Sequence, residues 1–215
     1  NQKFYYQNVG GMPIDSMIQM IKHFYYSKVK RGNPLIISYD YIKTTSENLN
    51  NKNEWQVVGE MIDKLKRLIA KDILFDSKPV VSIITSVQSN RSGITNNRSA
   101  DTIVDDESVV SLSDRITQFC THLFHLRKKT LDQLTEEQNL FGTHVLKSLK
   151  GRHLGNDVHR SLAPVRMPNG DQKDNYINLK FDNFNITEVG DLQDMVNAST
   201  EVSLNEDDPD NDLGI

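Results

Sequence analysis

The chain has 215 residues, of which 37% are hydrophobic and 25% charged, a composition typical of a globular domain with a sizeable core. Its one cysteine, Cys120, excludes a disulfide framework and a cysteine-based zinc site, and no apolar run predicts a membrane span or an export signal. The net charge is −4, but residues 188–215 hold nine acidic and no basic residues. Residues 1–187 therefore carry a net charge of about +5, which is compatible with nucleic-acid contact. We therefore expect a cytoplasmic protein without a membrane partner.

The first half of the chain predicts alternating strands and helices. Residues 4–6 suit a short strand, and Pro13 suits the first turn of a helix whose apolar residues follow 3.6-residue spacing. Residues 34–39 (PLIISY) predict a buried parallel strand. A second amphipathic helix is expected over about 54–71, with Trp55 on its apolar face. Another buried strand follows at 79–86 (PVVSIITS).

The second half predicts a long polar loop over 87–107, strands at 118–126 and 143–149, and a charged hairpin excursion at 128–138. Residues 176–181 (YINLKF) alternate as a late edge strand. The order of elements predicts an α/β fold with a mostly parallel sheet and antiparallel strands at one edge. We expect one domain over residues 1–189 and an acidic disordered tail over 190–215, because the tail composition does not support a core.

Polar side chains follow two of the apolar strands. Asp40 ends the run PLIISYD, where a carboxylate can hold Mg²⁺ beside a nucleotide, although a strand-terminal Asp also caps turns. Gln88 follows PVVSIITS, where an amide can hydrogen-bond a terminal phosphate or its attacking water, although a lone Gln in a loop is by default a surface residue. Arg91 suits a phosphate or DNA contact, or simply a solvated surface.

Two cations follow the strand expected at 143–149. Lys150 and Arg152 are one residue apart, so on an extended segment their side chains point the same way. Such a pair can reach an anion such as a γ-phosphate bound by a neighbouring subunit, and the alternative is a basic surface turn. His122 and His125, three apart in a predicted strand, face opposite sides and favour packing or surface roles over metal binding.

The order of three short motifs, ISYDY (37–41), TSVQSNR (85–91) and LKGRHLG (149–155), carries a family resemblance over residues 3–185. The chain resembles the DnaB-like replicative DNA helicases, particularly those of tailed bacteriophages. The resemblance implies a partial RecA-like P-loop ATPase core in which Asp40 is the Walker B residue that holds Mg²⁺ and ATP. It also implies that Gln88 senses the terminal phosphate, and that Arg152, with Lys150 beside it, is an arginine finger acting in trans.

The same resemblance implies the partners. The family forms a homo-hexameric ring around single-stranded DNA and unwinds the replication fork by hydrolysing ATP. The loops after Asp40 and Gln88, here about 44–53 and 90–107, correspond to its DNA loops. The candidate DNA-backbone contacts are Arg91, Asn96, Asn97 and Arg98. The acidic tail suits a solubilising end or a docking segment for a primase or helicase loader, and a phage-encoded member acts in the host cytoplasm.

The sequence departs from the family pattern at several points. It has no GxxxxGK[ST] phosphate-binding loop, and the catalytic glutamate of the family, which precedes the Walker B strand, has no counterpart. We therefore expect the chain to be inactive alone and to need an N-terminal helicase segment that carries these groups. Residues 105–108 are Asp-Asp-Glu-Ser where the family has Arg-Glu-Ser-Gly. A RecA/RadA-type recombinase ATPase fragment, a degenerate DNA- or partner-binding module and a plain α/β domain are the alternatives.

Overall fold

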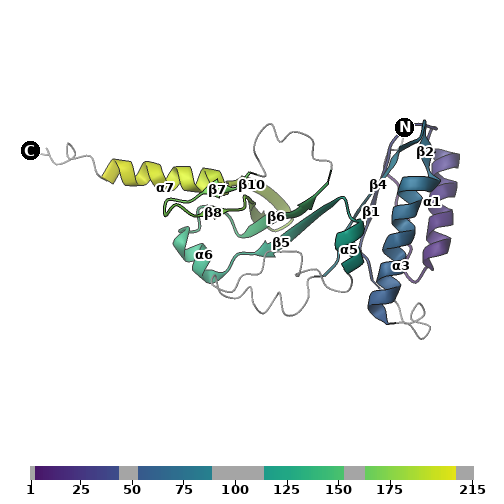
Figure 1. The fold of residues 1–215 in the computed structure, drawn as a ribbon, viewed down its shortest axis with the longest axis horizontal. Coiled ribbons are helices and arrows are strands. Elements are labelled where there is room, and N and C mark those ends of the chain that lie inside the picture. Colours follow the sequence, from purple (N-terminus) through teal and green to yellow (C-terminus); the bar gives the residue numbers. More distant parts are fainter. Residues whose placement is uncertain (1–2, 44–52, 89–113, 153–162, 207–215) are drawn as a thin grey trace, which may run out of the picture. The chain divides into compact units, whose positions relative to one another are not determined.

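The computed structural model describes residues 3–43, 53–88, 114–152 and 163–206, which fall into two compact units (Figure 1). The first unit holds the described residues up to 88 together with 114–120, and the second holds those from 121 onward. Each unit combines helices and strands, so a mixed α/β composition is confirmed, but the predicted mostly parallel sheet with antiparallel edge strands is not found among the described residues. Parallel pairing among the described residues is confined to one two-stranded sheet, and the antiparallel strands form sheets of their own.

Two amphipathic helices form the helical part of the first unit. These helices and the turn that extends the second are α1 (Ile14–Lys28), α3 (Glu54–Arg67) and the π-helical turn η1 (Leu68–Asp72). Helix α1 begins directly after Pro13, whose fixed φ suits a helix start. The helices lie side by side, and the Lys64 ammonium of α3 is 2.7 Å from the Asp15 carboxylate of α1 (Figure 1). Both predicted helices are thus confirmed.

The strands of the first unit are short. They are β1 (Leu35–Tyr39), β2 (Leu74–Phe75), β3 (Lys78–Pro79) and β4 (Val81–Thr85), followed later in the chain by helix α5 (Asp114–Phe119). Strands β1 and β4 pair in parallel, with Tyr39 opposite Thr85, while β2 and β3 form an antiparallel hairpin. The prediction of parallel strands is confirmed, but Ile36 and Ile84 are 70% and 63% exposed, so these strands are buried on one face only.

An apolar cluster joins the helices of the first unit to its strands. Its buried members are Met17, Ile18, Ile21, Tyr25, Leu65, Leu68, Ile73 and Val81. Half of them come from α1, where 3.6-residue spacing places them on one face. Leu68 and Ile73 are fully buried, and each such side chain stabilises the fold by about 1.5–3 kcal/mol. Trp55 was expected on the apolar face of α3 but is 55% exposed, because the helix packs through Val58 and Leu65 instead.

The second unit is built on an antiparallel sheet. Its elements are β5 (His122–Lys128), α6 (Leu131–Glu136), β6 (His144–Gly151), β7 (Val165–Arg166), β8 (Gln172–Lys173), β9 (Ile177–Asp182), β10 (Asn185–Asp191) and α7 (Leu192–Glu206). Four strands form a sheet in the order β10-β9-β6-β5, and β7 pairs with β8. Gly142 precedes β6 with a φ of +71°, and a Cβ there would meet the Leu179 backbone oxygen at 2.6 Å, so glycine is required.

Three predicted strands or loops differ in the structure. Residues 4–6 form no strand, because their apolar pattern finds no neighbouring strand among the described residues. Helix α5 occupies the beginning of the strand expected at 118–126, and helix α6 replaces the hairpin excursion at 128–138. The missed signal for α6 is a capping box: Thr130 and Gln133 exchange hydrogen bonds between side chain and backbone at 3.2 Å in both directions.

The end of the second unit also differs from the prediction. Strand β9 is an interior strand, because β10 follows it through the turn at Asn183, whose φ of +54 suits asparagine. Residues 192–206, expected to be disordered, form α7. Its start is set by Asp191 and Asp194, each of which accepts a hydrogen bond from the other's backbone N–H, at 2.9 and 3.0 Å. No helix in the described part of the chain is long and apolar enough to cross a membrane.

Candidate functional site

Asp40 and Gln88 follow the carboxyl ends of the two parallel strands in the first unit. Strands β1 and β4 are parallel neighbours, so their carboxyl ends lie at the same edge of the sheet. Asp40 and Gln88 both follow at this edge, where ligands of open α/β sheets bind. The pairing continues beyond the strands: the Thr85 hydroxyl donates to the Tyr39 carbonyl at 2.8 Å, and the Ile42 N–H donates to the Ser86 carbonyl at 3.1 Å. Asp40 thus follows the last residue of β1 directly, and Gln88 lies three residues beyond the last residue of the neighbouring β4.

A small apolar cluster anchors this edge. Ile42 is 2% exposed and packs with Val58 of α3 and Ile116 of α5, against Tyr39 and Val87. Burial raises the pKa of the Tyr39 hydroxyl above its usual value, which keeps that group neutral at ordinary pH. The backbone on either side of the edge is thus held by buried neighbours.

The side chains at this edge face solvent. Asp40 and Gln88 are both exposed, and the peptide bond between Asp40 and Tyr41 is cis. An exposed carboxylate offers oxygen ligands of the kind that Mg²⁺ prefers, and a neighbouring amide can donate to a phosphate oxygen. Among the described residues, no group of three or more His, Cys, Asp or Glu side chains is placed to hold a metal ion by itself. Mg²⁺ in proteins is commonly held by one or two carboxylates together with the phosphates of a substrate.

A half-open groove of about 250 Å³ lies on the same unit, lined by Trp55, Gln56, Glu60 and Arg115. It lies on α3 and α5, the two helices whose Val58 and Ile116 pack against Ile42 near the strand ends. The 3.6-residue spacing of α3 predicts Trp55 in the core, whereas the side chain is 55% exposed and lines this groove. At the start of α3 the Asn53 backbone N–H donates to the side-chain oxygen of Gln56, one of the groove residues, at 3.0 Å.

Lys150 and Arg152 lie at the end of β6 in the second unit. Lys150 is half-buried opposite Leu123, and Arg152 follows the strand with its side chain exposed. The Arg152 backbone N–H donates to the Thr121 carbonyl at 2.9 Å, which ties this end of β6 to the start of β5. The structure thus places an exposed guanidinium on a braced strand end. The candidate DNA contacts Arg91, Asn96, Asn97 and Arg98 lie outside the described residues.

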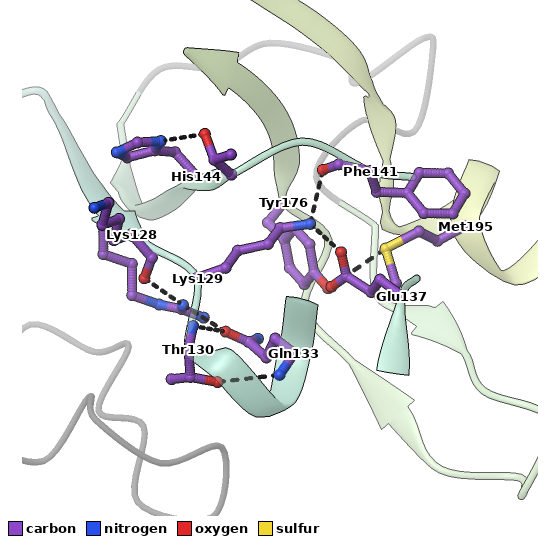
Figure 2. A network of polar contacts seen from close by, with 11 residues as sticks. Lys128, Lys129, Thr130, Gln133, Glu137, Phe141, His144, Tyr176 and Met195 are labelled. Atoms are coloured by element: carbon purple, nitrogen blue, oxygen red, sulfur yellow. Dashed lines mark hydrogen bonds and ion pairs between the residues drawn. The ribbon is translucent and has the colours of Figure 1, made fainter. Parts of the chain in front are cut away.

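The second unit also holds a buried polar network that the sequence analysis did not predict (Figure 2). The Lys129 ammonium donates to the Phe141 carbonyl at 2.8 Å and forms an ion pair with Glu137, and their side chains are 0% and 7% exposed. Burial lowers the pKa of Lys129 and raises that of Glu137, while their mutual attraction opposes both shifts. Figure 2 shows the ammonium pointing between the two acceptors.

The neighbouring side chains extend this network. The Arg127 guanidinium donates to the Gln133 side chain at 2.8 Å, and the same Gln133 oxygen caps the start of α6. The network therefore connects β5 and α6 to the turn before β6. Because every group in it has a partner within the unit, it suits a structural clamp rather than a catalytic centre.

Searches against protein-family models, curated proteins and solved structures found no match to this chain.

Proposed function

We propose that the chain supplies part of the RecA-like ATPase core of a DnaB-like replicative helicase, which moves along single-stranded DNA and unwinds duplex at the replication fork. The observation that carries the proposal is the shared edge at which Asp40 and Gln88 follow neighbouring parallel strands. Ligands of open α/β sheets bind at the carboxyl ends of their strands, and nucleotide hydrolysis needs a Mg²⁺ carboxylate and a phosphate-facing polar group there. The choice of the DnaB-like helicase family rests on the order of the three motifs along the sequence.

ATP and Mg²⁺ are the cofactors that this proposal implies, and the groups at the strand ends fit them. The exposed Asp40 carboxylate offers oxygen to a hard cation, and the Gln88 amide offers a donor to the terminal phosphate or its attacking water. Arg152 is exposed on a braced strand end, as a finger that reaches a neighbouring subunit must be. ATP, when bound, would supply the phosphoryl group, Asp40 would hold the cation, and Gln88 and Arg152 would offset the charge that develops during transfer.

The proposed activity also needs a phosphate-binding loop, which the 215 residues do not contain. The test is therefore made on the chain assembled with a helicase segment that carries a Walker A loop. ATP hydrolysis is measured with and without single-stranded DNA, for wild type and for Asp40→Asn and Arg152→Ala. We expect Arg152→Ala to lower turnover roughly 10³- to 10⁵-fold, and Asp40→Asn to lower it roughly 100-fold or more.

Matched variants control for nonspecific effects. Asp63→Asn replaces another exposed Asp of the first unit, and Arg166→Ala another exposed Arg of the second, and both are expected to retain turnover. Mixing Asp40→Asn chains with Arg152→Ala chains should restore activity, because some subunit interfaces then combine an intact Asp40 with an intact Arg152. If both variants hydrolyse ATP at the wild-type rate, the strand edge is not a nucleotide site. Hydrolysis with strand exchange but no unwinding would instead indicate a recombinase.

A further inference from the structure

The four-stranded sheet of the second unit buries polar side chains on one of its two faces. Arg127 is 8% exposed and Asn178 0% exposed, and the register places both on the same face. Helix α6 contacts this face through Gln133, whose side chain accepts from the Arg127 guanidinium at 2.8 Å. Helix α7 contacts it through Met195, whose sulfur accepts from the Tyr176 hydroxyl at 3.9 Å (Figure 2). Both helices therefore pack on the face that carries the buried polar groups.

The opposite face of the same sheet, here called the outer face, is apolar. Its most exposed apolar side chains are Phe124, Leu126 and Ile186, at 57%, 48% and 59%. The register pairs Leu126 with Leu146 and Ile186 with Phe181, so two half-buried apolar side chains lie directly beside them. Antiparallel sheets ordinarily turn the apolar face to the core and the polar face to water. An apolar face that is turned to solvent therefore marks an interaction surface.

Two opposite charges lie at the two edges of the outer face. Lys128 of β5 pairs with His144 of β6, and His144 pairs with Leu179 of β9. Leu179 in turn pairs with Glu188 of β10, so the four residues form one row across the sheet, from one edge strand to the other. Lys128 and Glu188 are both exposed, and neither forms an ion pair with another described residue. The row therefore carries a cation and an anion on opposite sides of its middle.

We propose that the outer face binds the outer face of a second copy of the chain, with Lys128 of each copy opposite Glu188 of the other. A two-fold axis that runs parallel to the strands, between β6 and β9, lays β5 of one copy over β10 of the other. The apolar side chains are then buried between two sheets, as in a β-sandwich. This contact is isologous, unlike the head-to-tail contacts that close a ring, and it does not rest on the proposed ATPase function.

The charges of the outer face favour a second copy over other occupants. A nucleic acid or another partner of uniform charge is attracted by one edge and repelled by the other, and an uncharged helix gains nothing from either. A copy turned by the two-fold axis meets each charge with its opposite. Strands of six to eight residues, about 4.8 Å apart, give a face roughly 20 Å wide and 24 Å long. Because that interface is small, we expect a dissociation constant of roughly 1–100 µM.

Sedimentation equilibrium of the whole chain, at roughly 5–200 µM, measures the association. Leu126→Asp puts one carboxylate from each copy into the apolar interface and should weaken association roughly 100-fold or more. Leu131→Asp is the matched control, because Leu131 is 79% exposed on α6, the helix that contacts the other face. A wild-type chain that is monomeric at roughly 200 µM overturns the proposal. A dimer that both variants affect equally overturns it as well.

Exchanging the two charges tests the two-fold arrangement. Lys128→Glu and Glu188→Lys each place two like-charged pairs in a homodimer, and each should weaken association roughly 2- to 30-fold, the range for losing two exposed ion pairs. The double variant should recover the wild-type affinity, because both pairs again join opposite charges. Lys180→Glu, at an exposed lysine of β9 on the other face, is the control and should leave association unchanged. A double variant that associates no better than the single variants contradicts the proposal.

Mixing the two single variants tests whether the occupant is a second copy. In a mixed dimer one copy carries two carboxylates and the other two ammonium groups, so both cross pairs join opposite charges. With Lys128→Glu labelled by ¹⁵N and Glu188→Lys unlabelled, native mass spectrometry separates the mixed dimer from the two homodimers. Mixed dimers should exceed the fraction of about one half that random pairing gives, and a fraction of one half or less would refute the two-fold contact. The experiment involves no ATP, so its outcome and that of the ATPase tests are independent.

Discussion

The two units of the chain bury different kinds of side chain. The interior of the first unit is an apolar cluster drawn from two helices and a strand, with Leu68 and Ile73 fully buried. The second unit buries charged and polar groups, among them Lys129 and Arg127, and the fully buried amide of Asn178 has no hydrogen-bond partner within the described residues. Outward strand positions carry large apolar side chains in both units, at Ile36 and Ile84 in the first and at Phe124 and Leu126 in the second.

This difference shows how each unit is specified. Apolar burial has no preferred direction, so the first unit needs only helices and strands that present their apolar faces to one another. A buried ion pair is stabilising only when its geometry and remaining hydrogen bonds are satisfied, so the second unit depends on a particular arrangement of β5, α6 and the turn at Phe141.

The largest expected effect comes from breaking the buried pair. Glu137→Gln leaves the Lys129 ammonium buried without a counter-charge and should lower the free energy of unfolding of the second unit by about 3–5 kcal/mol. Hydrogen exchange of the β6 amides measures it. The double variant Lys129→Met, Glu137→Leu should recover most of the loss, because no buried charge remains. A double variant as unstable as the single one would show that the cost arises from packing alone.

In the first unit the corresponding test is to remove part of a buried apolar side chain. Leu68→Ala should lower the free energy of unfolding by about 2–5 kcal/mol, because Leu68 is fully buried and its removal leaves a cavity. Urea unfolding followed by Trp55 fluorescence reports this unit, since Trp55 is the chain's one tryptophan. Ile36→Ala, at a position 70% exposed, is the control and should change stability by about 0.5 kcal/mol or less. Equal effects would contradict the assignment of the core.

The smallest expected effect is a pH dependence of the free energy of unfolding, which Lys129→Met should introduce in the second unit and not in the first. Lys129→Met removes the attraction that lowers the Glu137 pKa, so burial raises that pKa further above the unfolded value of about 4.3. A carboxyl whose pKa is raised on folding contributes stability below its unfolded pKa, and the contribution is lost as pH rises through the folded pKa. Hydrogen exchange of the β6 amides, corrected for intrinsic rates, should show stability falling by at most about 1.4 kcal/mol per pH unit. The Trp55-reported transition should not differ from wild type, and the double variant should lose the added slope.

Local sequence patterns predicted the elements whose cause is local. Helix α1 follows from Pro13 and the spacing of Met17, Ile18, Ile21 and Tyr25, and β1 and β4 follow from compact apolar runs. Helices α6 and α7 were also locally encoded, through the Thr130–Gln133 and Asp191–Asp194 exchanges, but their charged composition concealed them. The candidate site residues were also recognised from local sequence, because Asp40 and Gln88 each follow an apolar run.

What the sequence by itself determined is the class of the elements with a clear apolar spacing, namely α1, β1, α3 and β4, and the position of Asp40 and Gln88 after two of these strands, since both depend on residues near in the chain. Only the tertiary structure decided that β1 and β4 are neighbours, that Trp55 faces a groove rather than the core, and that Lys129 meets Glu137 and Phe141. It also decided that Phe124 and Lys128 share one open face with His144. The physical reason is that burial and pairing depend on partners distant along the chain, whose identity no local spacing contains.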